Sequence, residues 1–327
     1  MHFLKKYFRF MNENKLNVVY MGTPEFAVAP LQAILEKGHQ VSAVVTVPDK
    51  PAGRGRKLRS SAVKEFAAEH GLKVLQPEKL RDESFITELT NLSADVFVVV
   101  AFRMLPAAVW QIPKLGTFNL HASLLPQYRG AAPINWAVIN GEKKSGVTTF
   151  LIDDKIDTGS ILMQKEIALS RDETAGSLHD KLMIIGAELV VETLNGLANK
   201  TIQPKVQETG ELKPAPKIFK EDCKIDWNLP GDKIESFIRG LSPYPAAYTE
   251  IKSAEVNGQF KITQAKFIAE NSNADFPQMK IEGKELFVQL KDGKLQLGQI
   301  QPQGKRSMSA KDFVNGIQDK NQVFTIG

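Results

Sequence analysis

The chain has 327 residues, of which 43% are hydrophobic and 24% charged, with a formal net charge of +5 and a pI near 9.0. This length exceeds what one hydrophobic core usually serves, so two domains are expected. The ordinary composition excludes a fibrous or largely disordered chain. The positive balance is compatible with a polyanionic partner but does not by itself identify one.

Cysteine usage and the N-terminus both indicate a reducing compartment. The single cysteine, Cys223, cannot form an internal disulfide, and an inert structural thiol is favoured over a catalytic one. The five histidines show no HxxxH spacing, so no metal site is expected. The apolar runs of residues 1–14 are too short for a secretion signal, and no later apolar run is long enough for a membrane span. We interpret residues 1–14 as an extension of a cytoplasmic protein, with a transit peptide as the alternative.

Short apolar runs alternate with helical patterns over residues 15–207. The pattern predicts strands near 17–21, 40–47, 73–76, 94–102, 116–121, 146–152 and 160–168, and helices near 22–38, 61–70, 82–91 and 175–198. Thr23 is expected to cap the first helix, with Pro24 in its first turn. Apolar strands separated by helices predict an α/β domain with a doubly wound, mostly parallel, Rossmann-like sheet. Because no GxGxxG follows the first strand, a dinucleotide cofactor is not indicated.

A cluster of positive charge follows the second predicted strand. The segment from residue 50 to residue 64 contains six basic residues and no acidic one: Lys50, Arg54, Arg56, Lys57, Arg59 and Lys64. Cations on a loop rich in glycine and proline can contact phosphates of a nucleic acid. A solvated surface is the other interpretation of such a run.

The second half of the chain has a different pattern. Residues 208–221 carry Pro214 and Pro216 among charged residues, which predicts a linker between a catalytic domain (15–207) and a C-terminal domain (222–327). A helix near 233–240 is followed by apolar runs separated by Gly, Asp and Asn turns. This pattern predicts a small antiparallel β-barrel.

Asn119 and His121 stand two residues apart at the end of the run "TFNLH". In an extended strand both side chains point to one face, about 7 Å apart. Ligands of open parallel sheets bind at the carboxyl ends of the strands, so the pair can address one substrate. A pair of satisfied structural residues is the alternative.

Three carboxylates, Asp153, Asp154 and Asp157, follow the next apolar strand. They could ligate a hard cation, form a solvated loop or orient an imidazole. If Asp157 reaches His121, its charge fixes the ring tautomer and favours the protonated ring.

Such a set suits attack of an external amine on a carbonyl. Asn119 would donate a hydrogen bond to the developing oxyanion, and His121 would assist proton transfer between the two nitrogens. Ser123 is an alternative nucleophile, but "HASLL" lacks the GxSxG elbow, and a loop serine bonded to its own backbone is favoured. The predicted reaction is group transfer from an activated acyl donor.

The strings "NLHASLLPQYRGAAPINWAV" and "IDDKIDTG" resemble the formyltransferase family that uses 10-formyltetrahydrofolate. "VPDKPAGRGRKL", "KEDCKIDW" and "GLSPYPAAYT" are similar to its methionyl-tRNA formyltransferase branch, and the resemblance runs over nearly the whole chain from about Lys15. It implies transfer of a formyl group from that folate to the α-amino group of methionyl initiator tRNA. It also implies an OB-like C-terminal barrel and no metal.

The resemblance assigns roles to individual residues. The family's catalytic residues fall on Asn119, His121 and Asp157. Its folate-binding turn matches Ser123, Leu124, Leu125 and Pro126, whose backbone groups are expected to hold the pteridine. Its tRNA-contacting loop matches the segment that carries Lys50, Arg54, Arg56, Lys57 and Arg59, with Arg54 the residue singled out.

The chain departs from the family pattern at four positions. Phe102 and Arg103 stand near the expected folate pocket, where the family usually has a tyrosine and a glycine, and Ile152 and Lys155 replace a common methionine and glycine. Neither of the last two changes touches Asp157.

Several rivals use the same residues or the same fold. The amine could belong to an amino-sugar nucleotide or to glycinamide ribonucleotide, water could be the acceptor, or the protein could be an inert tRNA-binding module. The basic loop and the second domain favour tRNA over a small amine, and the intact trio argues against an inert module. A monomer is the default expectation.

Overall fold

The structure is a computed structural model that describes residues 15–52, 57–270 and 277–327. It forms two compact units. Unit 1 takes its residues from Met1–Gly130, Ser145–Ile167 and His179–Pro214, and unit 2 takes its residues from Ala131–Lys144, Ala168–Leu178 and Ala215–Gly327. Two short segments, Ala131–Lys144 and Ala168–Leu178, therefore pack with the C-terminal part although unit 1 residues separate them from it in the sequence.

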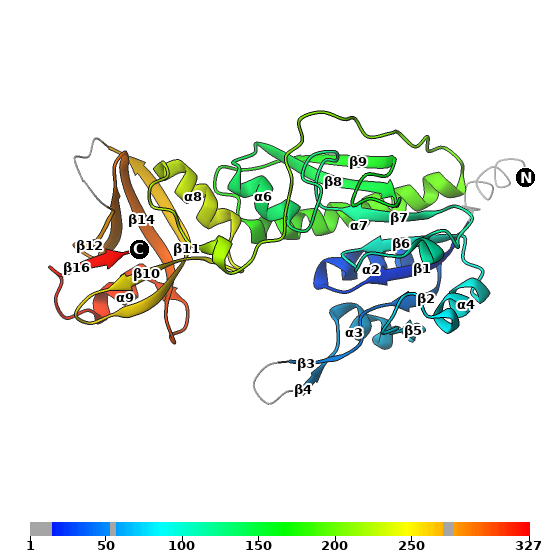
Figure 1. The fold of residues 1–327 in the computed structure, drawn as a ribbon, viewed down its shortest axis with the longest axis horizontal. Helices are drawn as coiled ribbons and strands as arrows, with labels where there is room; N and C mark the ends of the chain where they lie inside the picture. The colour runs from blue at the N-terminus through cyan, green and yellow to red at the C-terminus, as the bar shows by residue number, and fades with distance from the viewer. Residues whose placement is uncertain (1–14, 53–56, 271–276) are drawn as a thin grey trace, which may run out of the picture. The chain divides into compact units, whose positions relative to one another are not determined.

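Unit 1 is built on a seven-stranded sheet with the order β5-β2-β1-β6-β7-β8-β9 (Figure 1). Its strands are β1 (Asn17–Gly22), β2 (Gln40–Val45), β5 (Val74–Leu75), β6 (Val96–Val100), β7 (Thr117–His121), β8 (Lys144–Leu151) and β9 (Ile161–Ala168). The first five strands in this order pair in parallel, and β8 runs antiparallel to β7. The doubly wound, mostly parallel sheet predicted from the apolar runs is confirmed.

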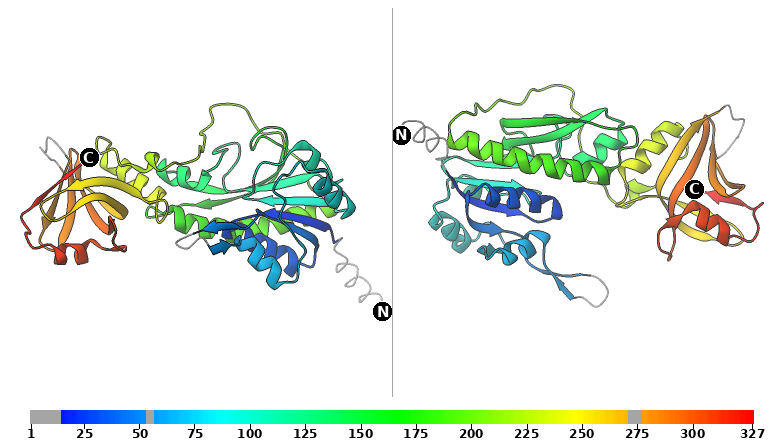
Figure 2. Two further views of the ribbon diagram at one scale, coloured as in Figure 1. Left: turned by 60° about the horizontal axis from the view of Figure 1, so that its bottom comes forward. Right: turned by 180° about the vertical axis from the view of Figure 1, so that it is seen from behind.

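Helices cover both faces of this sheet, as the two views of Figure 2 show. They are α2 (Val28–Glu36), α3 (Ala62–Glu69), α4 (Glu83–Asn91), α5 (Ala107–Trp110) and α7 (Ala175–Ala198). On one face Phe85 and Leu89 of α4 share a core with Phe97. On the other face α7 comes so close that a Cβ on Gly186 would lie 2.9 Å from a Leu120 methyl group, so a larger residue there would force the Leu120 side chain to shift. No described helix is long and apolar enough to cross a membrane.

The first helical segment begins differently from the prediction. A 3-10 turn, η1 (Glu25–Ala27), precedes α2, and its N-cap is Pro24, with no side-chain cap. The Thr23 hydroxyl is buried without a hydrogen-bond partner among the described residues. The expected Thr23 cap is therefore wrong, because Pro24 takes the capping position one residue later.

The basic segment is predicted to be a loop, but its described parts form the two strands of a β-hairpin. Strand β3 (Lys50–Ala52) pairs antiparallel with β4 (Lys57–Arg59), and Lys50 lies opposite Arg59. Two of the cations are thereby neighbours across the hairpin. Residues 53–56 lie outside the described part of the chain.

Unit 2 is a closed antiparallel barrel with flanking helices. The strands are β10 (Ala247–Lys252), β11 (Asn257–Ala269), β12 (Gln278–Glu282), β13 (Glu285–Leu290), β14 (Gly293–Pro302), β15 (Met308–Ser309) and β16 (Val323–Ile326). Their order is β11-β10-β16-β12-β13-β14-β15, and pairing of β11 with β14 closes the ring. The helical elements are α6 (Pro133–Ile139), η2 (Glu221–Cys223), α8 (Gly231–Gly240) and α9 (Ala310–Gly316). The predicted C-terminal barrel is confirmed.

Candidate active site

Asn119 and His121 lie at the end of β7, between β6 and β8. Asn119 is opposite Val99 of β6 and Phe150 of β8, and His121 is opposite Thr148. Because β6 and β7 run in parallel, both end at the same edge of the sheet. The two side chains therefore stand on one face at the carboxyl edge, where open α/β sheets bind ligands.

The His121 ring is held between two oxygen atoms. Its Nε2 lies 2.8 Å from the main-chain oxygen of Tyr128, and its Nδ1 lies 3.7 Å from Oδ2 of Asp157. A carbonyl oxygen can only accept, so Nε2 carries a proton in the neutral and in the charged ring. The Nδ1 contact is too long for a hydrogen bond, which leaves Nδ1 able to bond a substrate group while the carboxylate acts through its charge.

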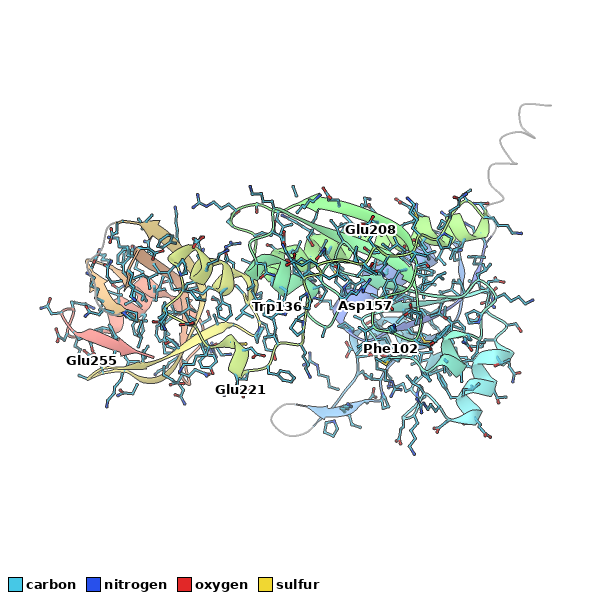
Figure 3. All side chains as sticks on the ribbon, turned by 45° about the horizontal axis from the view of Figure 1, so that its top comes forward. Phe102, Trp136, Asp157, Glu208, Glu221 and Glu255 are labelled. Atoms are coloured by element: carbon cyan, nitrogen blue, oxygen red, sulfur yellow. The ribbon has the colours of Figure 1, made fainter. Side chains whose placement is uncertain are left out.

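The Asp157 carboxylate is fixed by the backbone of the preceding loop. Its Oδ2 accepts a hydrogen bond of 2.9 Å from the Gly130 amide. Only 7% of the His121 side chain and 15% of the Asp157 side chain are exposed, so solvent screens this pair weakly. Figure 3 labels Asp157 in unit 1.

The other two carboxylates of the triplet face solvent. Asp153 accepts hydrogen bonds from the Lys155 amide at 3.0 Å and from the Thr158 hydroxyl at 2.7 Å, and thus orders its own loop. Asp154 is exposed. No group of three or more His, Cys, Asp or Glu side chains within the described ranges is arranged to hold a metal ion.

The Asn119 amide is partly exposed at the strand end. None of the residues that the structure describes makes a side-chain hydrogen bond to it, although its backbone is fixed in β7 on both sides. A fixed backbone with a free amide is the arrangement that a hydrogen-bond donor to a substrate oxygen needs.

The turn from Ser123 to Pro126 is tied to β8 and β9. The Thr148 hydroxyl donates to the Ser123 oxygen at 2.7 Å and accepts from the Leu125 amide at 3.1 Å. Gln164 donates to the Leu125 oxygen at 2.8 Å. Both backbone groups of Leu125 are thus engaged in the scaffold. The Leu125 amide is therefore not free to donate to a ligand, and the Leu125 oxygen has one lone pair left.

The Ser123 hydroxyl donates to the Gln127 oxygen at 2.7 Å, and the residue is buried. This is the local backbone bond favoured by the sequence, and it does not resemble an activated nucleophile.

Arg103 connects two loops at the same edge of the sheet. Its guanidinium donates to the Glu78 oxygen at 2.9 Å and to the Pro77 oxygen, and it lies 5.6 Å from the centre of the Phe102 ring. Burial lowers the pKa of Arg103 from its usual high value. The side chain is directed at backbone carbonyls after β5, and Phe102 is labelled in Figure 3.

The predicted tRNA-contacting residues are placed only in part. Lys50 and Arg59 are exposed on the hairpin, the Lys57 backbone belongs to β4, and Arg54 and Arg56 lie outside the described residues. Lys64, in contrast, pairs with Asp49 at 2.6 Å. The hydrogen bonds of Asp49 to Lys64 and then to Gln76 lower the pKa of its carboxyl. Lys64 therefore anchors the hairpin base.

Unit 2 contains a cavity of about 480 Å³ that the sequence did not predict. Its lining contains no carboxylate. It includes three lysines and three aromatic residues: Lys217, Lys220, Lys261, Phe219, Tyr244 and Tyr248. The Phe219 and Tyr244 side chains are 56% and 82% exposed, so their rings are accessible to a ligand. The cavity combines positive charge with stacking surfaces.

Cys223 lies at the wall of this cavity and is buried. Its Sγ contacts the Phe219 oxygen at 3.3 Å, and burial raises the pKa of the thiol. Because the thiolate is the reactive form, both observations support the inert thiol expected from the sequence.

Sequence reasoning missed Gln207, which lies one residue before the predicted linker. Its side chain is buried beside the Asp157 loop. The only sequence signal was an amide in an otherwise polar, charged stretch, which is too common to indicate a site.

The fold is that of a two-domain transferase, and its candidate site places an amide and an imidazole on one face at a strand end. The chain belongs to the formyl transferase family: residues 14–194 match the profile "Formyl transferase", and residues 217–318 match "Formyl transferase, C-terminal domain". The methionyl-tRNA formyltransferase of Flavobacterium johnsoniae is 50% identical over 304 residues, which cover 93% of this chain and 96% of the relative.

Two solved structures share the fold. HypX from Aquifex aeolicus in complex with tetrahydrofolic acid matches with a TM-score of 0.63 at 15% identity, over 95% of this chain and 51% of that one. The N-formyltransferase from Helicobacter canadensis, in complex with folinic acid and dTDP-3-aminofucose, matches with a TM-score of 0.59 at 21% identity, over 86% and 98% of the two chains.

Proposed function

We propose that this enzyme transfers the formyl group of 10-formyltetrahydrofolate to the α-amino group of methionyl initiator tRNA. The observation that carries the proposal is the arrangement of Asn119 and His121 on one face of a strand end, with the Asp157 carboxylate beside the ring. Relatives that are about half identical over nearly the full length are methionyl-tRNA formyltransferases. The product serves the start of translation.

The reaction forms a bond between the methionine nitrogen and the formyl carbon and breaks the bond from that carbon to the folate nitrogen. One proton leaves the attacking amine, and one proton reaches the departing nitrogen. Asn119 donates a hydrogen bond to the formyl oxygen, which becomes negatively charged in the tetrahedral intermediate. A free amide on a fixed strand provides this stabilisation without reorganisation.

His121 moves the proton through Nδ1. Since Nε2 donates to the Tyr128 oxygen, Nδ1 of the neutral ring has the lone pair that accepts the amine proton. The imidazolium that results lies 3.7 Å from Asp157, whose negative charge stabilises it until the proton is passed to the departing nitrogen. This assigns the general base and acid to one side chain.

The turn of Ser123, Leu124, Leu125 and Pro126 is the proposed folate contact. The hydrogen bonds of Thr148 and Gln164 hold this turn in one conformation next to His121. A rigid turn lowers the entropy that is lost when a planar ring is bound. The folate supplies the formyl group when it is bound.

Two surfaces are proposed to contact the tRNA. The hairpin presents Lys50 and Arg59 across from one another, and its remaining predicted contacts are Arg54, Arg56 and Lys57. The unit 2 cavity offers ammonium groups for phosphates and exposed rings for stacking on bases. We further propose that the enzyme acts in the cytoplasm, since its single buried thiol fits a reducing compartment, and we keep a monomer as the default.

The test compares three acceptors with one formyl donor. Purified protein is given 10-formyltetrahydrofolate with methionyl initiator tRNA, with a dTDP-amino sugar, or with no amine. We expect formyl-methionyl-tRNA and only background reaction in the other two tubes. Transfer to the sugar would show that the acceptor is a sugar amine and that the proposed chemistry is correct. Formate release without an amine would identify a hydrolase.

A further inference from the structure

We infer that Gln207 is a positioning residue that holds Asp157 against His121. The inference rests on the proposed function, because it assigns Gln207 a role in the same transfer. It is carried by the hydrogen bonds of one buried amide.

One end of the Gln207 amide bonds the loop that carries Asp157, and the other end bonds Arg129. Its Nε2 donates to the main-chain oxygens of Asp157 at 2.9 Å and Gly159 at 2.8 Å. Its Oε1 accepts from Nε and from a terminal nitrogen of Arg129, at 3.1 and 2.7 Å. Arg129 can only donate and the two carbonyls can only accept, so the amide has one possible orientation.

The same short segment reaches both ends of Asp157. Arg129 holds the main chain of Asp157 through Gln207. The next residue, Gly130, donates directly to the Asp157 carboxylate at 2.9 Å. The main chain and the side chain of Asp157 are therefore fixed to one element. Asp157 cannot rotate away from His121 without breaking at least one of these bonds.

The backbone of Asp157 has an uncommon conformation. Its φ is 54°, in the left-handed region, which L residues other than glycine rarely adopt, although aspartate tolerates it better than most. Gly159 closes the loop so tightly that a Cβ there would lie 1.7 Å from the Leu151 oxygen. Gln207 bonds the carbonyl on either side of this turn.

The position of Gln207 is itself fixed by register. Ile161 at the start of β9 and Lys205 exchange backbone hydrogen bonds of 2.7 and 2.8 Å. Gln207, two residues after Lys205, is thereby brought next to the loop that precedes β9. The chain after α7 thus supports the site although it lies far from Asp157 in the sequence.

The test is a double-mutant cycle of Gln207→Glu and Asp157→Asn. Glutamate keeps an oxygen for Arg129 but turns a second oxygen towards the two carbonyls, so the loop must move. We expect Gln207→Glu to lower kcat for formyl transfer by roughly 10- to 100-fold, as misplacement by about 1 Å does. The KM values for tRNA and folate should change less than about threefold. In the Asp157→Asn background the same change should cost less than about threefold, because its effect passes through Asp157.

A matched control and a second variant separate positioning from folding. Gln289→Glu changes another amide that donates to a main-chain oxygen, that of Gly293 at 2.9 Å in unit 2, and it should leave kcat unchanged. If Gln207→Glu does not fold, Gln207→Met takes its place in the test. It adds no charge and should show the same loss of kcat. Equal losses from Gln207→Glu in both backgrounds, or a loss confined to KM, would overturn the inference.

Hydrogen exchange distinguishes this inference from the proposed function. Amides of residues 152–160 should exchange faster in Gln207→Glu than in the unchanged protein, and at the same rate in Gln289→Glu. If the unchanged enzyme formylates no tRNA but this exchange increases, the proposed acceptor is wrong and the support of Asp157 stands. If the enzyme is active and the exchange does not change, the role of Gln207 is refuted.

Discussion

Nε2 of His121 lies 2.8 Å from the main-chain oxygen of Tyr128, and this contact determines which ring nitrogen can take a proton. The remaining nitrogen, Nδ1, faces Asp157. In the proposed mechanism Nδ1 is therefore the one acceptor on this ring for the proton of the amine, and the Asp157 carboxylate would stabilise the charged ring that results. The proposal gives His121 a role in the chemical step and none in RNA binding.

Replacing His121 should therefore abolish catalysis and leave RNA binding intact. We expect His121→Gln to lower kcat by about 10²- to 10⁴-fold, the usual contribution of a positioned acid or base. Affinity for methionyl initiator tRNA, measured by filter binding, should stay within about twofold. A parallel loss of affinity and turnover would contradict a purely catalytic role.

Asn119 should contribute through the developing oxyanion. Asn119→Ala removes the donor and should lower kcat by about 10²- to 10³-fold. Asn119→Asp places a negative charge near the same oxygen and should lower kcat further. Single-turnover kinetics with saturating substrates measures the chemical step, and an aspartate variant faster than the alanine variant would refute an oxyanion role.

The Thr148 hydroxyl should be needed for folate binding as well as for the stability of the fold. Thr148→Val leaves the buried Leu125 amide and the Ser123 oxygen without this partner, which should lower the free energy of unfolding by about 1–3 kcal/mol in urea denaturation. Thr149→Val is the matched control, because its hydroxyl pairs with Thr193 and does not reach the turn. Only Thr148→Val should raise the KM for the folate, and equal KM values in both variants would argue against the turn as the folate contact.

The sequence predicted the sheet well, because the buried strands of a parallel sheet are continuous apolar runs, and short runs of this kind between helical patterns are typical of such strands. Strand β7 shows the strength of this reasoning: the alternation of side chains placed Asn119 and His121 on one face, and the observed register has them there. The turn η1 that precedes α2 shows a limit. A threonine before a proline is typical of a capped helix start, yet the N-cap of η1 is Pro24 and no side chain caps it.

The support of the site could not be predicted, because its atoms come from residues that are distant in sequence or from the main chain. Gln207 lies 50 positions from Asp157, and the partner of His121 is a carbonyl that every residue possesses. Charge counting has a related limit. It counts Lys64 with the other cations of the segment, and it cannot show that Lys64 pairs with Asp49.

The exposed cations of the hairpin should govern the salt dependence of tRNA binding. Each lost phosphate contact lowers the slope of log K against log salt by roughly 0.7–0.9, so Lys50→Gln combined with Arg59→Gln should lower it by up to about two. Lys114→Gln combined with Lys200→Gln removes the same charge from exposed sites elsewhere in unit 1. Fluorescence anisotropy at several salt concentrations measures both slopes. Equal slopes for the two double variants would show that net charge, rather than the hairpin, attracts the RNA.

The Asp49–Lys64 pair should make the hairpin base sensitive to acid. Hydrogen bonding to Lys64 is the largest cause of the lowered pKa of Asp49, so Lys64→Met should move that pKa back up towards the ordinary aspartate value. A lowered pKa means that the pairing stabilises the folded hairpin above the ordinary aspartate pKa, and that this stabilisation is lost as the pH falls through the lowered value. Carboxyl ¹³C NMR of Asp49 measures the titration in both proteins. Gln76→Leu should shift the pKa in the same direction by less, because Gln76 is the second cause, and identical titrations in the unchanged protein and Lys64→Met would contradict the anchoring role of Lys64.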